Sequence, residues 1–333
     1  MSTTVEQIAN AVLYEGYVLY PYRPSAIKNQ QRWNFGLVYP RNCAAGPSEM
    51  QTECLVRGNT LTKLRVRVRF LHVVTRQVAE PGDFLTDGFH FVATKEIDGQ
   101  LFQTWQEAVE REIALPDYFP ADTLRSYREP FQFLPDVQVE QLTNRSGQLA
   151  GFLHRQSGFL EGRIEVSSKE VECGVYRITV RISNLMESNE PGRADHELVV
   201  LQSLVSAHTI LNVTDGDFVS LLEPPDELRT AAAACQNVGT WPVLAGEPGQ
   251  CKNLLSSPII LYDYPEVAPE SPGELFDGTE IDEILTLRIM TMTDSEKEEM
   301  RHSDERARRI LERTESLPPE HLAKLHGALR RHL

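Results

Sequence analysis

Apolar and polar residues alternate with a period of two along much of the chain, and this pattern predicts a body built mainly of β-strands. The clearest case is residues 60–77, where Arg65, Arg67 and Arg69 alternate with two valines and a phenylalanine. Such alternation is typical of a strand with one apolar face and one polar face. The same pattern recurs in residues 148–186 and predicts a β-meander there.

Shorter signals predict further strands and a hairpin turn. Asp98 and Gly99 lie between two apolar alternations, which is a typical signal for a tight hairpin. The second arm, residues 101–113, is interpreted as a strand, although the spacing of its apolar residues also fits a helix. Other apolar runs interpreted as strand are residues 198–204, 208–213, 258–262 and 284–292.

Helices are predicted at both ends of the chain. Residues 4–14 place four apolar residues on one helical face, namely Val5, Ile8, Ala9 and Val12. Near the other end, Thr293 and Glu296 form a capping box, so we expect a helix from there to about Thr314. Pro318 begins a second helix with its own leucine stripe, which completes a predicted helical hairpin.

Together these patterns predict an α+β fold, mainly antiparallel β in sandwich-like halves, with a C-terminal helical hairpin. Residues 116–135, rich in proline and aromatic residues, are the best boundary between the halves. The predicted division is 1–115 for the first β-rich half, 116–135 for the crossing segment, 136–223 for the second half, 224–292 for a helix, loops and an acidic strap, and 293–333 for the hairpin.

The charge of the chain bears on its partners and its location. The formal net charge is −15, which argues against nucleic acid as a partner because a phosphate backbone requires a basic surface. No apolar run approaches the roughly 20 residues that cross a bilayer, and the N-terminus has no basic region of the kind that begins a signal peptide. We therefore expect a cytoplasmic protein without a membrane span.

Motifs with specific chemistry are missing from the sequence. The five cysteines show no CxxC spacing, the histidines show no HxH or HExxH spacing, and no GxSxG or phosphate-binding loop is present. We therefore assign no catalytic, cofactor-binding or metal-binding residue. Cys173 or Cys251 with His154, His196 or His208 leaves a cysteine hydrolase open as an alternative.

An acidic strap, defined as residues 262–283, is the most unusual segment. It holds eight carboxylates and no lysine or arginine, and prolines keep its first half extended. It suits a structural strap along a basic face of its own protein, a contact with a partner, or a hard cation. Four of its carboxylates are candidate partner-binding residues: Asp277, Glu280, Asp282 and Glu283.

Two further groups are candidate partner-binding residues. Arg65, Arg67 and Arg69 share one strand face, which is interpreted as a solvated face, an anion or acidic-partner site, or a receiver for the acidic strap. The aromatic N-terminal segment contributes three more candidates, which are Tyr20, Tyr22 and Trp33. Large aromatic rings with a polar edge suit either the edge of a core or an interface.

Three stretches, residues 13–36, 206–222 and 256–293, resemble an uncharacterised bacterial family associated with gene clusters for nickel–iron uptake hydrogenases. The resemblance implies an accessory, maturation or complex component whose partner is a hydrogenase subunit or an assembly intermediate. It implies no catalytic residue. The chain lacks the CxxC or histidine-rich tract that metal delivery uses. A non-enzymatic interaction protein, a cysteine- or serine-dependent hydrolase in maturation, and a structural subunit whose strap only closes its own fold stay open.

Overall fold

A computed structural model describes most of the chain. The described residues are 3–15, 17, 33–81, 89–188, 196–266, 282–303 and 305–318. The strands are β1 (Glu49–Pro81), β2 (Phe89–Val92), β3 (Thr94–Ile97), β4 (Gln100–Gln103), β5 (Trp105–Ala114), β6 (Tyr127–Phe133), β7 (Asp136–Thr143), β8 (Leu149–Ser157), β9 (Leu160–Glu172), β10 (Val175–Asn184), β11 (Val205–Val219), β12 (Trp241–Leu244) and β13 (Asn253–Ser257). The helices are α1 (Thr3–Tyr14), α3 (His196–Val200), α4 (Arg229–Ala233), α5 (Asp282–Met290), α6 (Asp294–Ser303) and α7 (Glu305–Glu315), with a 3₁₀ turn at Asp226–Leu228.

The 33-residue strand β1 organises the whole sheet. Its first part pairs with β10, its middle with β11 and β5, and its last part with β8 and β2. All of these pairings are antiparallel, and β6, β7, β9, β12 and β13 extend them to an 11-stranded sheet. Because β1 belongs to the first predicted half and β8, β10 and β11 to the second, the two halves share one sheet.

The sheet folds over where β1 and β11 bend together. Between Gly58 and Lys63 the register shifts, so that four residues of β1 oppose the single residue Asp215 of β11. Glycine is required at this bend, since a Cβ on Gly216 would lie 2.7 Å from the carbonyl oxygen of Arg57. The hydroxyl of Thr62 closes the bend by donating to the carbonyl of Asp215 at 2.5 Å.

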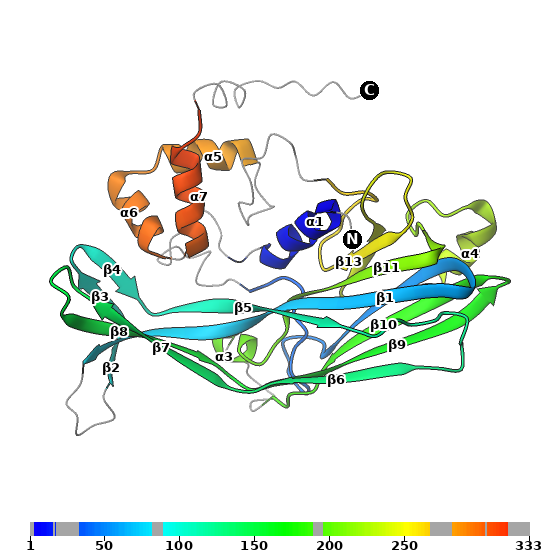
Figure 1. Ribbon diagram of the computed structural model, residues 1–333, viewed down its shortest axis with the longest axis horizontal. Coiled ribbons are helices and arrows are strands. Elements are labelled where there is room, and N and C mark those ends of the chain that lie inside the picture. The colour runs from blue at the N-terminus through cyan, green and yellow to red at the C-terminus, as the bar shows by residue number, and fades with distance from the viewer. Residues whose placement is uncertain are drawn as a thin grey trace.

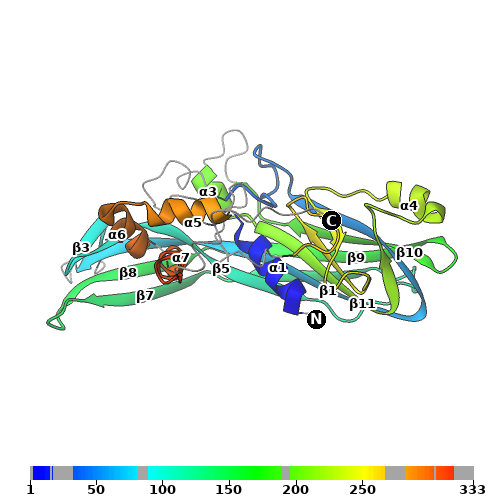
Figure 2. The same cartoon turned by 90° about the horizontal axis from the view of Figure 1, so that it is seen from above.

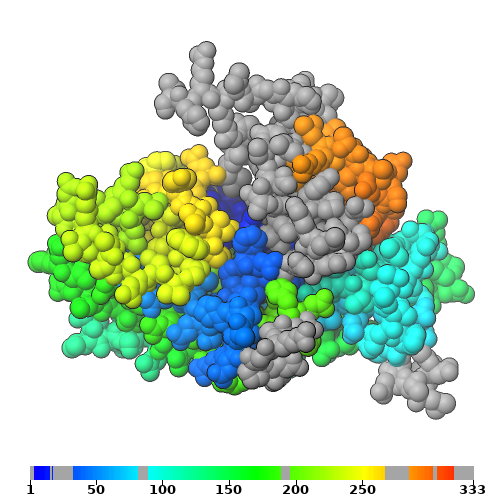
Figure 3. Space-filling view, turned by 180° about the vertical axis from the view of Figure 1, so that it is seen from behind, coloured from blue at the N-terminus to red at the C-terminus, as the bar shows by residue number. Residues whose placement is uncertain are grey.

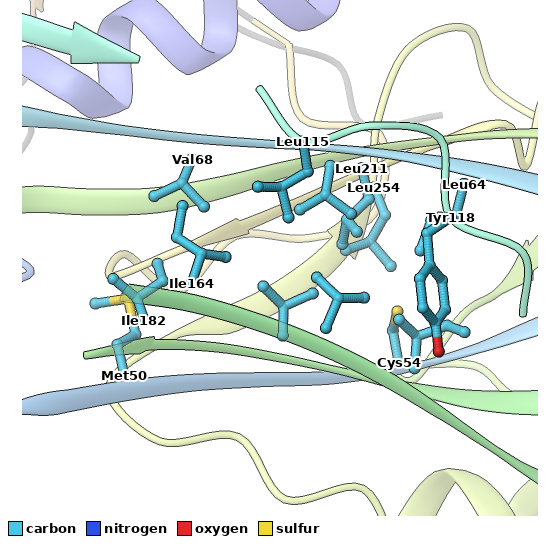
Figure 4. Close-up of a cluster of buried hydrophobic side chains, with 14 of the residues drawn as sticks. Met50, Cys54, Leu64, Val68, Leu115, Tyr118, Ile164, Ile182, Leu211 and Leu254 are labelled. Atoms are coloured by element: carbon cyan, nitrogen blue, oxygen red, sulfur yellow. The ribbon is translucent and has the colours of Figure 1, made fainter. Parts of the chain in front are cut away.

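The fold-over places the two parts of β1 on opposite sides of one hydrophobic core (Figure 1). Figure 4 shows Val68, Leu115 and Leu211 facing Ile164 and Ile182 across this core. Burial of such side chains is the main favourable term in folding, at roughly 25 cal/mol for each Å² of apolar surface removed from water. The predicted sandwich therefore arises from one folded sheet.

The helices α1, α5, α6 and α7 lie along one outer side of the folded sheet, whereas α4 lies at the end of the sheet away from α6 (Figures 1 and 2). Val5, Ile8, Ala9 and Val12 of α1 are buried against β11 and β13, which confirms the predicted apolar face of this helix. Apolar residues of α5, α6 and α7 form a second buried cluster with β1. Figure 3 shows these C-terminal helices, in orange, against the cyan segment that contains β3, β4 and β5.

The predicted fold class is confirmed: the structure is α+β, with mainly antiparallel strands and helices near its C-terminus. The hairpin turn at Asp98 and Gly99 is confirmed, as is the strand that follows it. The predicted capping box is also present, since the amide of Thr293 donates to Glu296 at 2.9 Å and the amide of Glu296 donates back to the Thr293 hydroxyl at 3.3 Å.

Several element predictions were wrong. Residues 284–292 were expected to form a strand, but most of them belong to the helix α5. The helix buries Leu285 and Ile289 on one face, because residues four apart lie about one helical turn from each other. The helix expected from 293 to 314 is divided into α6 and α7, and this division lets Met300 and Ile310 enter the same buried cluster. Residues 198–204 contain α3 and turns, and the strand expected at 258–262 lies earlier, in β13.

The crossing segment contains β6. The predicted second helix of the C-terminal hairpin lies outside the described residues.

Candidate interaction surfaces

The strands β2, β1, β8 and β7 lie together at one end of the molecule (Figure 1), and exposed apolar residues of β2 and β7 lie on one side of them. Their register aligns Phe91 with Ala79, Ala79 with Phe152, and Gln77 with His154. On the other side of β8, the partners of His154 and Gln156 are Val139 and Val137. We call this surface the aromatic face and define it as Phe89, Phe91, Val137, Val139, Phe152 and His154.

The rings of the aromatic face form one connected group. The centroid of Phe89 lies 5.0 Å from that of Phe152 in an edge-on arrangement and 6.2 Å from that of the stacked Phe91 ring. The imidazole of His154 lies 5.5 Å from Phe91 and 6.0 Å from Phe89. Such distances are typical of favourable aromatic pairs, so the cluster has a defined shape.

The aromatic face is uncharged and open. Charged residues make up 24% of the chain, yet none occupies the eight positions that β1, β7 and β8 contribute to this side: Gln77, Ala79, Val137, Val139, Gln141, Phe152, His154 and Gln156. The exposed fractions of Phe91, Val137 and Val139 are 45%, 51% and 46%. Nδ1 of His154 is buried and has no hydrogen-bond partner in the described part of the chain.

Charged residues lie on the opposite side of the same strands. Glu107 there accepts hydrogen bonds from Arg76 at 2.7 Å and from Arg155 at 2.8 Å, and Arg155 also reaches Glu140 at 2.7 Å. This side therefore combines ion pairs with a buried apolar cluster of Val78, Leu142 and Leu153, whereas the exposed aromatic and aliphatic groups lie on the aromatic face. Depletion of charge together with enrichment in aromatic residues is typical of the core of a protein–protein interface.

The three arginines of β1 have different surroundings. Arg65 is exposed and contacts Asp117 at 3.3 Å, as the predicted solvated face requires. That prediction was wrong for Arg67 and Arg69, because α1 and β5 cover them. Arg67 pairs with Glu6 of α1 and with Glu112 of β5.

The guanidinium of Arg69 is the most enclosed of the three. Its side chain is 8% exposed and contacts Asn10 at 2.8 Å, Glu110 at 3.2 Å and Glu112 at 3.6 Å. Burial, together with the positive charges of Arg69 and Arg67, lowers the pKa of the neighbouring His208 to about 4. This cluster attaches α1 to the sheet, so Arg67 and Arg69 act inside the fold.

A polar cleft of about 490 Å³ lies between the C-terminal helices and the sheet. Five arginines line it, namely Arg76, Arg155, Arg301, Arg306 and Arg308. Each also contacts a carboxylate: Arg301 reaches Glu298 and Glu315, Arg306 reaches Glu110, and Arg308 reaches Glu312. Because these carboxylates offset the arginine charges, the cleft is an internal ion-pair network and a weak candidate for an anion site.

The remaining predicted contact residues divide into buried and undescribed ones. Trp33 is buried, its Nε1 donates to Gln106 at 2.8 Å, and its ring lies edge-on to Tyr17 at 5.2 Å. It therefore belongs to the buried cluster beneath the helices. Tyr20, Tyr22, Asp277 and Glu280 lie outside the described residues, and so do the side chains of Asp282 and Glu283, whose backbone begins α5.

The cysteines of the chain have different surroundings. All five cysteines are free. Burial raises the pKa of the Cys54 thiol and raises that of Cys235 to about 11, which disfavours a reactive thiolate. The sulfur of Cys251 lies 3.6 Å from the Tyr264 hydroxyl. The described residues contain no group of three metal-ligating side chains, and none of their helices could span a membrane.

Comparison of the chain with protein-family models and with curated proteins finds no match.

Sequence reasoning missed the aromatic face. Val137 and Val139 are separated by one polar residue, and so are Phe89 and Phe91. This alternation of apolar and polar residues was a visible signal for strands with one apolar side. Alternation gives the two sides of a strand without telling which one the fold covers. Only the pairing of β7 with β8, and of β2 with β1, brings these residues onto one open surface.

Proposed function

We propose that this chain is a non-enzymatic accessory protein of the cytoplasm that docks a protein partner on its aromatic face. The observation that supports the proposal is the uncharged group of Phe89, Phe91, Val137, Val139 and Phe152, in which Phe91, Val137 and Val139 are exposed and the other two rings are half-buried beside them. An exposed apolar surface does not help to keep a chain in solution, so this surface needs another explanation. Contiguous exposed apolar patches of this kind mark binding sites.

The resemblance to a bacterial family associated with nickel–iron hydrogenase gene clusters gives the first partner to test. This is a hydrogenase subunit or an assembly intermediate of one. The net charge of −15 makes nucleic acid a poor partner. The acidic strap, with Asp277, Glu280, Asp282 and Glu283, is proposed as a second contact that strengthens binding to a basic surface of the same partner.

The test measures binding of the purified full chain to a purified nickel–iron hydrogenase large subunit by biolayer interferometry. Phe91→Ser and Val139→Ser should each weaken binding by about tenfold or more, because truncated anchors at the centre of an interface cost roughly 2 kcal/mol. Leu124→Ser is the matched control. Leu124 is 99% exposed and lies outside the aromatic face, so this variant should bind as the wild type does.

Two outcomes contradict the proposal. The first is absence of binding by the wild-type chain. The second is equal binding by all three serine variants. In a separate arm, replacing the four strap carboxylates by amides should weaken binding more at low salt than at high salt, since salt screens exposed charges.

A further inference from the structure

The strand β7 forms an edge of the sheet at the same end as the aromatic face. In the described part of the chain, β7 pairs with β8 alone. Figure 2 shows it as the outermost strand on that side. Seven of its eight residues are exposed, and only Leu142 is buried. Alternate backbone amides and carbonyls of an edge strand point away from the sheet and can pair with another chain.

The edge of β7 has little of the usual protection against such pairing: its register shift lies at its end, between Leu142 and Thr143, and its two charges, Asp136 and Glu140, share one side. The strand β6 runs immediately before it along the same edge and contains Pro130, whose nitrogen has no hydrogen to donate. Pro135 separates the two strands. No proline, glycine or lysine occurs between Asp136 and Thr143. The seven residues from Asp136 to Leu142, in regular register and beside an apolar face, are therefore a template for one more strand.

The two sides of β7 specify the chemistry of the added strand. Val137 and Val139 point to the aromatic face, so every second side chain of an added strand would lie beside them and should be apolar. Asp136 and Glu140 lie on the other side, where Glu140 pairs with Arg155 and Asp136 accepts a hydrogen bond from Gln138. The intervening side chains of the added strand would meet these carboxylates and should be basic.

We propose that β7 accepts an extended segment of the partner, with alternating apolar and basic residues, as an additional β-strand. This proposal says how the partner binds, and it rests on the proposed function for the identity of that partner. Main-chain hydrogen bonds supply affinity in this binding mode, and alternate side chains supply specificity. A second copy of the chain fits less well because it would bring another net charge of −15 and a second set of Asp136 and Glu140 to the same edge.

The experiment uses the full chain and the synthetic peptide Lys-Val-Lys-Val-Lys-Val-Lys. Backbone hydrogen exchange, followed by mass spectrometry, reports protection of residues 136–143 when the peptide is added. A peptide with the same residues in blocks (four lysines, then three valines) and an alternating Glu–Val peptide are the controls. The alternating Lys–Val peptide should protect β7 and bind roughly tenfold more tightly than either control.

Two adjacent proline variants test the main-chain contacts. Of Gln138→Pro and Val139→Pro, one removes an amide that points to β8 and the other removes an amide that points outward. The outward variant should keep its fold and lose peptide binding by roughly tenfold, while the inward one should be destabilised. If both variants unfold, hydrogen exchange of the wild-type chain with the peptide tests strand addition by itself.

Failure of this inference differs from failure of the proposed function. No new protection of residues 136–143, or equal protection by all three peptides, overturns strand addition. Protection that appears without peptide as the protein concentration rises, together with a dimer in light scattering, overturns it in favour of a second copy. Binding of the hydrogenase subunit that depends on Phe91, without protection of β7, overturns strand addition alone. Protection by the Lys–Val peptide without binding of that subunit overturns the proposed partner alone.

Discussion

At the scale of single residues, two buried histidines connect the stability of this protein to pH. Burial, together with the positive charges of nearby arginines, lowers the pKa of His72 and of His208 to about 4. Below about pH 6.5 the unfolded chain takes up protons at these sites while the folded chain does not. The free energy of unfolding should therefore fall from pH 6.5 towards pH 4, by about 3 kcal/mol for each histidine.

Urea unfolding between about pH 7 and pH 4 checks this prediction. His208→Gln should make the fall in stability with pH shallower, because the amide does not titrate. His90→Gln serves as the control, since His90 is exposed. A wild-type stability that stays constant down to pH 4 would contradict the prediction.

At the scale of elements, the alternating arginines of β1 should differ in their contribution to stability. Arg69 is 8% exposed and faces Glu6, Glu110 and Glu112, whereas the side chain of Arg65 is 66% exposed. Arg69→Ala removes an enclosed cation together with its hydrogen bonds to Asn10 and Glu110, which should cost about 2–3 kcal/mol. Arg65→Ala should cost about 1 kcal/mol or less.

Chemical denaturation of the two arginine variants side by side provides the measurement. Loss of Arg69 should also loosen α1, which hydrogen exchange over residues 3–14 would show as faster exchange. Equal destabilisation by the two substitutions would mean that the cluster beneath α1 contributes no more than an exposed pair.

At the scale of the whole molecule, the shared sheet should make the two β-rich halves fold as one unit. The strand β1 crosses both layers and pairs with β8, β10 and β11 from beyond the crossing segment. A fragment of residues 1–135 would lose these partners and should stay unfolded. The intact chain should unfold in one transition.

Thermal unfolding followed by far-ultraviolet circular dichroism and by tryptophan fluorescence tests this cooperativity. Coincident curves are expected, because Trp33, Trp105 and Trp241 report from different parts of the same fold. Two separated transitions, or a folded 1–135 fragment, would show that the halves are independent domains.

The sequence by itself determined the local structure wherever one residue pattern has one physical meaning. The alternation in residues 60–77 specified a strand, Asp98 and Gly99 specified a turn, and Thr293 with Glu296 specified a helix start. The apolar face of α1 was equally clear. These signals depend on backbone geometry and neighbouring residues alone, so they need no knowledge of the rest of the chain.

Only the tertiary structure decided which faces are covered and which are open. The pattern at Arg65, Arg67 and Arg69 is uniform, yet α1 and β5 cover Arg67 in part, bury Arg69 and leave Arg65 in solvent. The same limit applies to Val137 and Val139, whose exposure depends on what packs around β7. Burial is set by contacts between segments far apart in the sequence, and a periodic pattern carries no information about those contacts.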